Sequence, residues 1–302
     1  YKRQQVGRTF SGTGPDMSTS GSKTPPASQR SVEPCRGHVV ARTTMAYAAE
    51  VLLLATLFTV LAPFGARAQV LDPSTAALLQ ASDAELVLAG VRDELDRNLS
   101  ALGVEPTQEQ ADVLSRFLGL EPLLGVMGRE LQRLGDPDTR AAAARMLETG
   151  AIARVDALRD AEPPSLTLDA YVANLDERPP TQARIQLMNQ VVAGQAAGPA
   201  HVLLAERIRE ASHRIARATG ADVEPFAPLT QADWVARAEE AHRETLISFL
   251  HQYENVPDEL LEARVQDWIT DTGAWFSEAY SVALAETVLV AADSAVTALG
   301  GG

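Results

Sequence analysis

The sequence has a single cysteine, Cys35, in 302 residues. Cys35 precedes an apolar run that we interpret below as part of a signal peptide, so the mature chain would have no cysteine. This excludes a disulfide framework, a thiolate metal site and a cysteine nucleophile from the mature protein. Alternating, β-branched segments bounded by turns, which are typical of strands, are also absent. The sequence therefore predicts an all-α fold, a multi-helix bundle with no β-sheet.

Lysine is missing from most of the chain. Residues 69–302 hold 18 Arg, no Lys and 37 Asp or Glu, a formal net charge of −19. A negative field of this size repels phosphate backbones and anionic lipid surfaces. We therefore expect no nucleic-acid partner. The same segment is long enough to form a core without covalent cross-links.

The most informative feature that is present is an apolar run over residues 51–64, followed by Ala66-Arg67-Ala68. The run is shorter than the roughly 20 apolar residues that a membrane span needs. Small residues two positions apart, as at Ala66 and Ala68, are typical of signal-peptide cleavage. We expect a signal peptide over 45–68 and an exported, periplasmic or secreted, mature domain over 69–302.

The segment before the signal peptide is a different kind of sequence. Residues 1–44 are rich in Ser, Thr, Gly, Pro and Gln. Such a stretch buries too little apolar surface to offset the entropy of ordering it, so we expect a disordered leader. Met17 and Met45 are alternative start positions, and a start at Met45 would leave this leader untranslated.

Capping and breaker residues divide the mature chain into helices. Ser82-x-x-Glu85 and Thr107-x-x-Gln110 have the spacing of capping boxes, which open helices. Pairs of prolines and Gly-Pro steps interrupt helices elsewhere. The expected helices cover 82–101, 107–117, 121–134, 138–160, 167–176, 181–195, 200–218 and 230–253, then one with Pro257 in its first turn and a last one over 274–299.

The last of these helices is apolar around most of its circumference. Its large side chains include Trp275, Phe276, Tyr280, Leu284 and Val288. A helix of this kind is usually central in a bundle. Membrane insertion is the alternative, but three acidic residues interrupt the segment and count against it: Glu278, Glu286 and Asp293. We expect no integral membrane span in the mature chain.

Two stretches of the chain resemble each other, 168–173 and 261–266. Each follows a long helix and a short break with a proline, and each precedes another helix. One interpretation is a duplicated helical-hairpin unit. The other is that any two amphipathic helices in an Ala- and Leu-rich chain match this well.

The second stretch, continued to residue 276, resembles an exported bacterial family, the domain of unknown function 2059. Its members read Leu-x-x-Tyr-Val-x-Phe, then Ser-Pro-x-Gly, then a helix opening with aromatic and small residues. Val265 and Gly273 match the family, and the family's Tyr, Phe and Pro are replaced by Arg264, Asp267 and Asp271. The resemblance covers about 117–299. It implies a periplasmic helical protein and supplies no catalytic residues.

The matched motif also predicts a packed hairpin on physical grounds. Leu261, Val265 and Trp268 have the spacing of a core stripe along one helix face. Gly273 is expected to take the left-handed conformation that ends a helix. The aromatic residues at 275–276 would then fold back onto that stripe.

Two Glu-x-x-His pairs, Glu210 with His213 and Glu239 with His242, are the sharpest hint of chemistry. Di-iron bundles use two such pairs facing their core. On a helical projection, Glu210 and His213 lie opposite the apolar stripe and face water, while His242 is half-buried, so the pairs would not meet. We therefore predict no metal, no cofactor and no catalytic residue. His201 is expected to be a surface or satisfied core histidine.

The leading interpretation is an exported, soluble, non-enzymatic helical protein of unknown molecular function. It would act by helix-surface contacts with a protein or a small apolar ligand. One alternative is a carboxylate–histidine metal protein that uses the two Glu-x-x-His pairs. A second is a peripheral envelope protein that associates through its apolar C-terminal helix.

Overall fold

The computed structural model describes residues 71–300, and all structural statements below concern this range. The leader, the signal peptide and its cleavage residues Ala66 and Ala68 lie outside it. The described chain is entirely helical with no strand, which confirms the predicted fold class. In chain order the helices are α2 (Pro73–Ala81), α3 (Ala84–Ala101), α4 (Gln108–Leu118), α5 (Leu120–Leu134), α6 (Pro137–Thr149), α7 (Ala151–Ala161), α8 (Leu168–Ala173), α9 (Gln182–Gly194), α10 (Ala197–Ala218), α11 (Gln231–Gln252), α12 (Asp258–Ile269) and α13 (Asp271–Gly300).

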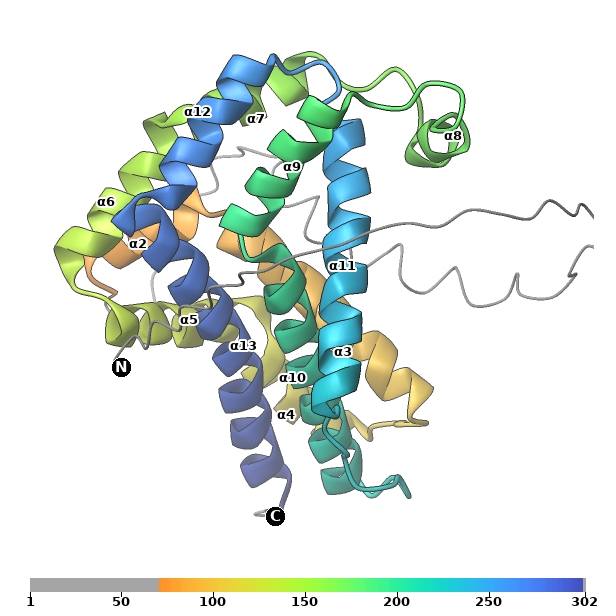
Figure 1. Cartoon of the computed structure of the whole chain (residues 1–302). Coiled ribbons are helices and arrows are strands. Elements are labelled where there is room, and N and C mark those ends of the chain that lie inside the picture. The colour runs from red at the N-terminus through yellow and green to blue at the C-terminus, as the bar shows by residue number, and fades with distance from the viewer. Residues whose placement is uncertain (1–70, 301–302) are drawn as a thin grey trace, which may run out of the picture. The chain divides into compact units, whose positions relative to one another are not determined.

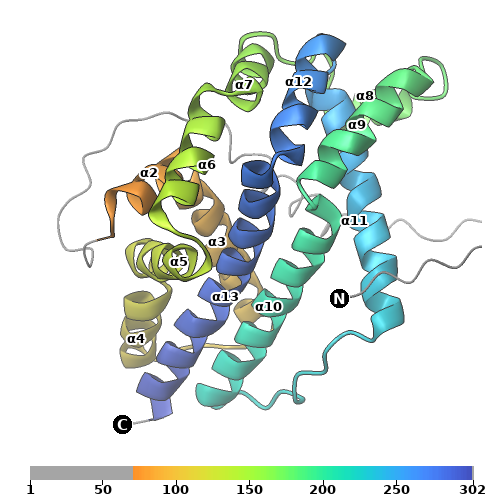
Figure 2. The same cartoon turned by 60° about the vertical axis from the view of Figure 1, so that its left-hand side comes forward.

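The longest helix, α13, lies in the middle of the bundle, as predicted. It packs against α10 along much of its length and also contacts α4, α5, α6 and α12 (Figures 1 and 2). By length and composition α13 is the one described helix that would suffice to cross a membrane. The core helix of a soluble protein has the same composition. Here α13 is covered on the sides that pack against α4, α5 and α10, and part of its apolar surface, including Val290, is exposed.

The core has two parts. The larger one joins α2–α6, α10 and α13, and includes Leu88, Met127 and Val288, each fully buried. The smaller one joins α7, α9, α11 and α12, around Met188 and Tyr253. Because α10 and α11 also pack against each other, the two parts are connected along that helix pair.

The predicted capping box at Ser82 is wrong. Ser82 ends α2 instead, where its hydroxyl donates to Leu79 O. The chain then turns at Asp83, whose left-handed backbone (φ 49°, ψ 35°) links α2 to α3. Aspartate is one of the few side chains that adopts this conformation readily. The capping box at Thr107 and Gln110 is confirmed.

The single helix predicted over 138–160 is two helices, α6 and α7, separated at Gly150. The carboxylate of Asp267 in α12 accepts hydrogen bonds from the first amides of α7, 2.6 Å from Ala151 N and 3.3 Å from Ile152 N. A side chain at 150 would lie 2.6 Å from that carboxylate oxygen. This cap comes from a residue more than a hundred positions away, and local sequence therefore does not reveal the break.

The predicted α12–α13 hairpin does not form, because α13 continues beyond Thr270 in roughly the same direction as α12 (Figure 2), and two further details differ from the prediction. Gly273 lies in the first turn of α13, where a Cβ would be 2.8 Å from Trp268 Cα, so it permits close approach and is not left-handed. Phe276 stacks on Trp268 as expected, with ring centroids 5.9 Å apart. Trp275 points away, toward α5, and its Nε1 donates to Leu134 O at 3.1 Å.

The two similar stretches occupy different environments. α8, from the first stretch, has six residues, none of them buried, and its Val172 is 45% exposed. α12, from the second, has twelve residues, and the corresponding Val265 is 7% exposed. α8 lies at the edge of the bundle, beside α11 (Figure 1). The two stretches therefore do not have equivalent structural roles.

Candidate functional site

The four residues proposed as metal ligands are not brought together. Glu210 of α10 pairs with Arg207 at 2.9 Å and with Arg214 at 2.5 Å. Its side chain is 14% exposed, so the prediction that it faces water is wrong. His213 Nδ1 instead lies 3.1 Å from Glu224 O.

The second pair is also separate. His242 Nε2 lies 3.1 Å from Asn189 Oδ1 of α9, and Glu239 is exposed. Within residues 71–300 no group of three or more His, Cys, Asp or Glu side chains is arranged to hold a metal ion. Glu210 and His213 both come from α10, but Glu210 pairs with arginines of the same helix and His213 contacts the loop that follows it.

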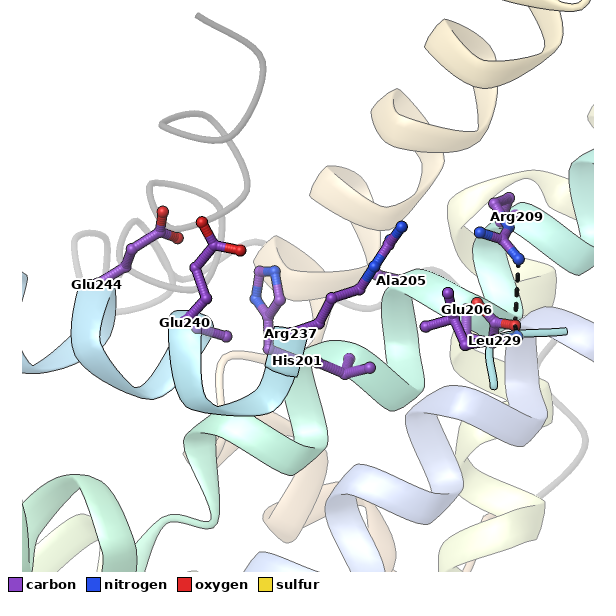
Figure 3. A pocket seen from close by; sticks show the side chains of 10 residues that line it. His201, Ala205, Glu206, Arg209, Leu229, Arg237, Glu240 and Glu244 are labelled. Atoms are coloured by element: carbon purple, nitrogen blue, oxygen red, sulfur yellow. Dashed lines mark hydrogen bonds and ion pairs between the residues drawn. The ribbon is translucent and has the colours of Figure 1, made fainter. Parts of the chain in front are cut away.

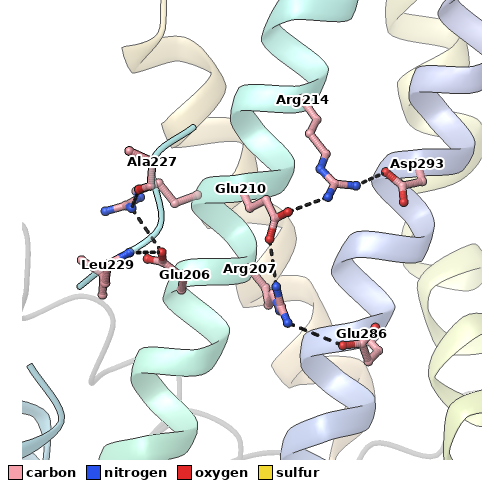
Figure 4. A network of polar contacts seen from close by, with 9 residues as sticks. Glu206, Arg207, Glu210, Arg214, Ala227, Leu229, Glu286 and Asp293 are labelled. Carbon is pink, nitrogen blue, oxygen red and sulfur yellow. Dashed lines mark hydrogen bonds and ion pairs between the residues drawn. The ribbon is translucent and has the colours of Figure 1, made fainter. Parts of the chain in front are cut away.

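Glu210 belongs to a network that joins α10 to α13 (Figure 4). Arg214 bridges Glu210 and Asp293 of α13, both at 2.5 Å. Its hydrogen bond with Asp293 is the main reason that the pKa of Arg214 is raised, although burial works against it. Arg207 adds a longer contact to Glu286, 3.9 Å. Every charged group in this network has an oppositely charged partner.

One turn earlier on α10, Glu206 holds the loop between α10 and α11 (Figure 4). Its carboxylate accepts from Leu229 N at 2.8 Å and from Arg209 at 3.3 Å. Arg209 also donates to Ala227 O at 2.6 Å and lies over the Phe226 ring. These contacts hold the loop against α10, where Leu229 forms one wall of a pocket.

This pocket lies between α10 and α11 (Figure 3) and has a volume of about 90 Å³. Gly198 makes the close packing of the two helices possible, because a Cβ there would lie 2.6 Å from Ala238 O. Val202 and Ala241, both buried, supply apolar surface. The charged lining comes from α10 and α11: His201, Glu206, Arg209, Arg237, Glu240 and Glu244.

Four of these side chains have no hydrogen bond or ion pair within the described part of the chain: His201, Arg237, Glu240 and Glu244. Burial lowers the pKa of His201, and Glu94 of α3 partly opposes this. Burial, and then the nearby Glu240, raise the pKa of Glu244. Arg243 opposes the shift at Glu244, but in both groups burial is the largest effect and disfavours the charged form.

The unpaired groups are arranged by charge. The carboxylates of Glu240 and Glu244 point in the same direction (Figure 3). Arg237 extends the other way, past His201 and toward Arg209. One end of the pocket is therefore acidic and the other basic. Such a pocket can bind a small polar molecule, but it has no hydroxyl or thiol nucleophile among its lining residues.

A second hollow of about 480 Å³ lies between the α8–α9 connection and the α11–α12 turn. It is wide and shallow, and Arg184 at its wall already pairs with Asp258 and with Tyr253 O. Beside it, the Tyr171 ring packs on His251, with centroids 5.3 Å apart. The smaller pocket is the better candidate because its charges lack partners.

Sequence reasoning missed this site. His201 was expected to be a surface or satisfied core histidine, and it is half-buried at the pocket wall, with neither ring nitrogen among the described buried atoms that lack a partner. The sequence does contain one indication of the site. The spacing of Arg237, Glu240 and Glu244 places all three on one helix face together with Ala241. What the sequence does not show is that this face meets His201 of α10.

Comparison with protein-family models, curated proteins and solved structures found no match for this chain. The resemblance to the domain of unknown function 2059 therefore depends on the motif residues alone. Two departures from that motif have a structural role here. Asp267 caps α7, and Arg264 is buried beside Asp156, with 2.7 Å between Nη1 and the carboxylate.

Proposed function

We propose that this protein is an exported, non-enzymatic binding protein and that the α10–α11 pocket holds its ligand. Export is supported by the apolar run over 51–64 and the Ala66-Arg67-Ala68 site after it. Binding is supported by one observation above all. Four ionisable side chains surround a pocket without partners, while the charged network next to it is fully paired.

The physical argument is one of compensation. Withdrawing a charge from water is unfavourable unless hydrogen bonds or opposite charges replace the lost hydration. At Glu210 that compensation comes from Arg207 and Arg214. Arg237 and Glu240 are exposed, and Glu244 is half-buried near Arg243, so water hydrates these charges in the free protein, and a bound polar molecule would take the place of that water. A small apolar ligand fits this lining poorly.

The two alternatives have less support. A metal protein would need Glu210, His213, Glu239 and His242 close together, and each has a different environment. Association through α13 would have to use the part of its apolar surface around Val290, because the rest of the helix packs against α10 and α5. Stoichiometric iron, manganese or zinc in the purified protein would nevertheless restore the first alternative.

Mass spectrometry of protein recovered from the periplasm of a Gram-negative host tests the proposal. Under denaturing conditions we expect a mass beginning at Gln69. Under native conditions we expect a small-molecule adduct that is lost in the double variant Glu240→Gln, Glu244→Gln and kept in the control Glu239→Gln. An uncleaved mass would contradict export. An adduct that the pocket variant retains would contradict the assignment of the site.

A further inference from the structure

The pocket between α10 and α11 has opposite charges at its two ends, and two of the side chains that carry them, Arg237 and Glu240, are exposed. Arg237, Glu240 and Glu244 follow one another along one face of α11, and the side chain of Arg237 points away from the two carboxylates (Figure 3). With a rise of about 1.5 Å per residue, the basic and acidic positions are roughly 4–10 Å apart along the helix axis. This is within reach of the two ends of one small molecule.

From this geometry we infer that the ligand is a small zwitterion of the amino-acid class, with a primary ammonium at one end and a carboxylate at the other. The inference rests on the proposed function of the pocket. The ammonium would lie at Glu240 and Glu244, since a primary ammonium has three donors and can bond both carboxylates. The carboxylate would accept hydrogen bonds from Arg237, whose planar guanidinium matches a carboxylate in a bidentate geometry.

The remaining charges of the lining support a ligand with both signs. Glu206 and Arg209 pair with each other, with 3.3 Å between nitrogen and oxygen, so they add no free charge. A simple amine would satisfy Glu240 and Glu244 but leave Arg237 without an acceptor. A simple carboxylate would satisfy Arg237 but add a third negative charge beside the two glutamates. A zwitterion compensates both ends.

The size of the pocket sets the length of the ligand. A water molecule needs roughly 10–15 Å³ of such space, so about 90 Å³ accommodates roughly six non-hydrogen atoms. The buried side chains of Val202 and Ala241 provide an apolar surface for a short hydrocarbon link. His201, between the acidic and basic ends, can donate or accept one hydrogen bond from the middle of the ligand. β-Alanine has this size and charge pattern.

Calorimetric titration of the mature protein with three probes of matched length tests the inference. The probes are β-alanine, n-propylammonium and propionate at neutral pH. We expect β-alanine to bind at least tenfold more tightly than either single-charge probe. We expect Glu240→Gln, Glu244→Gln and Arg237→Gln each to weaken β-alanine binding at least fivefold. The controls, Glu239→Gln and Arg217→Gln, change exposed residues outside the pocket and are expected to have no effect.

The outcomes separate the inference from the proposed function. Equal binding of β-alanine and n-propylammonium would overturn the zwitterion and leave a cation site in the same pocket. Propionate binding that depends on Arg237 would overturn it in favour of an anion site. If none of the probes binds, the ligand class is wrong. The native-mass experiment above then decides separately whether the pocket holds another molecule. β-Alanine binding that none of the pocket variants weakens would place the ligand elsewhere and overturn both.

Discussion

Replacing Asp83 with asparagine is expected to stabilise the fold at about pH 8 and to leave its stability unchanged at about pH 3.5. Asp83 is half-buried at the junction of α2 and α3. Its pKa is raised from 3.8 to about 6, chiefly by burial and then by the nearby charge of Asp156 and, less, of Asp160 of α7, while Arg159 opposes them. Tyr280 of α13 is the other titratable group facing it.

The sign follows from proton linkage. The folded state holds the Asp83 proton more tightly than the unfolded state, so folding stability falls as the pH rises from about 4 through about 6. A shift of about 2 pKa units corresponds to at most about 3 kcal/mol. Because the side chain is only partly buried, screening by water reduces this to about 1 kcal/mol. Asparagine removes the charge and tolerates the left-handed backbone equally well.

Urea denaturation followed by circular dichroism at both pH values measures this effect. At about pH 8 the variant is expected to gain about 1 kcal/mol in the free energy of unfolding, or about 2–4 °C in Tm. Asp93→Asn, at an exposed position on α3, is the matched control and should change little at either pH. A gain of equal size at both pH values, or a loss at about pH 8, would refute the assignment of the buried charge.

Three substitutions test the packing of α12. Asp267→Ala removes the cap on the Ala151 amide and should lower the free energy of unfolding by about 1–2 kcal/mol in urea denaturation. Gly273→Ala brings a Cβ against α12 and should cost about 2–3 kcal/mol in the same assay, and an unchanged midpoint would contradict the close approach. Arg264→Ala removes the 2.7 Å partner of Asp156 and leaves this partly buried carboxylate with Arg159, at 3.4 Å. It should lower stability by about 3 kcal/mol, and a loss below about 1 kcal/mol would show that the pair is solvated.

Most of the helix pattern could be predicted because its signals are local. Thr107, Thr181 and Thr230 cap their helices through side-chain bonds within three residues, and the sequence shows such pairs directly. The central place of α13 follows in the same way from its apolar circumference. Where the signal is long-range the prediction failed. The break at Gly150 depends on Asp267 from α12.

The candidate site could be predicted only in part, because it also depends on contacts between residues far apart in the sequence. The face of α11 that carries Arg237, Glu240 and Glu244 can be read from their spacing, but an exposed helix has charged residues on one face anyway. Only the packing of α11 on α10 at Gly198 closes that face into a pocket with His201. The Glu-x-x-His pairs have the spacing of metal ligands, but Glu210 pairs with two arginines of its own helix, and the two histidines contact other segments of the chain.

The central claim is that the charges around the α10–α11 pocket are completed by a ligand. A crystal structure of the mature protein grown with β-alanine at neutral pH tests it most directly. We predict density within the pocket, with the ammonium in hydrogen-bonding range of Glu240 and Glu244 and the carboxylate against Arg237. Direct ion pairs of Arg237 with either glutamate, in a pocket closed to the added molecule, would contradict the claim.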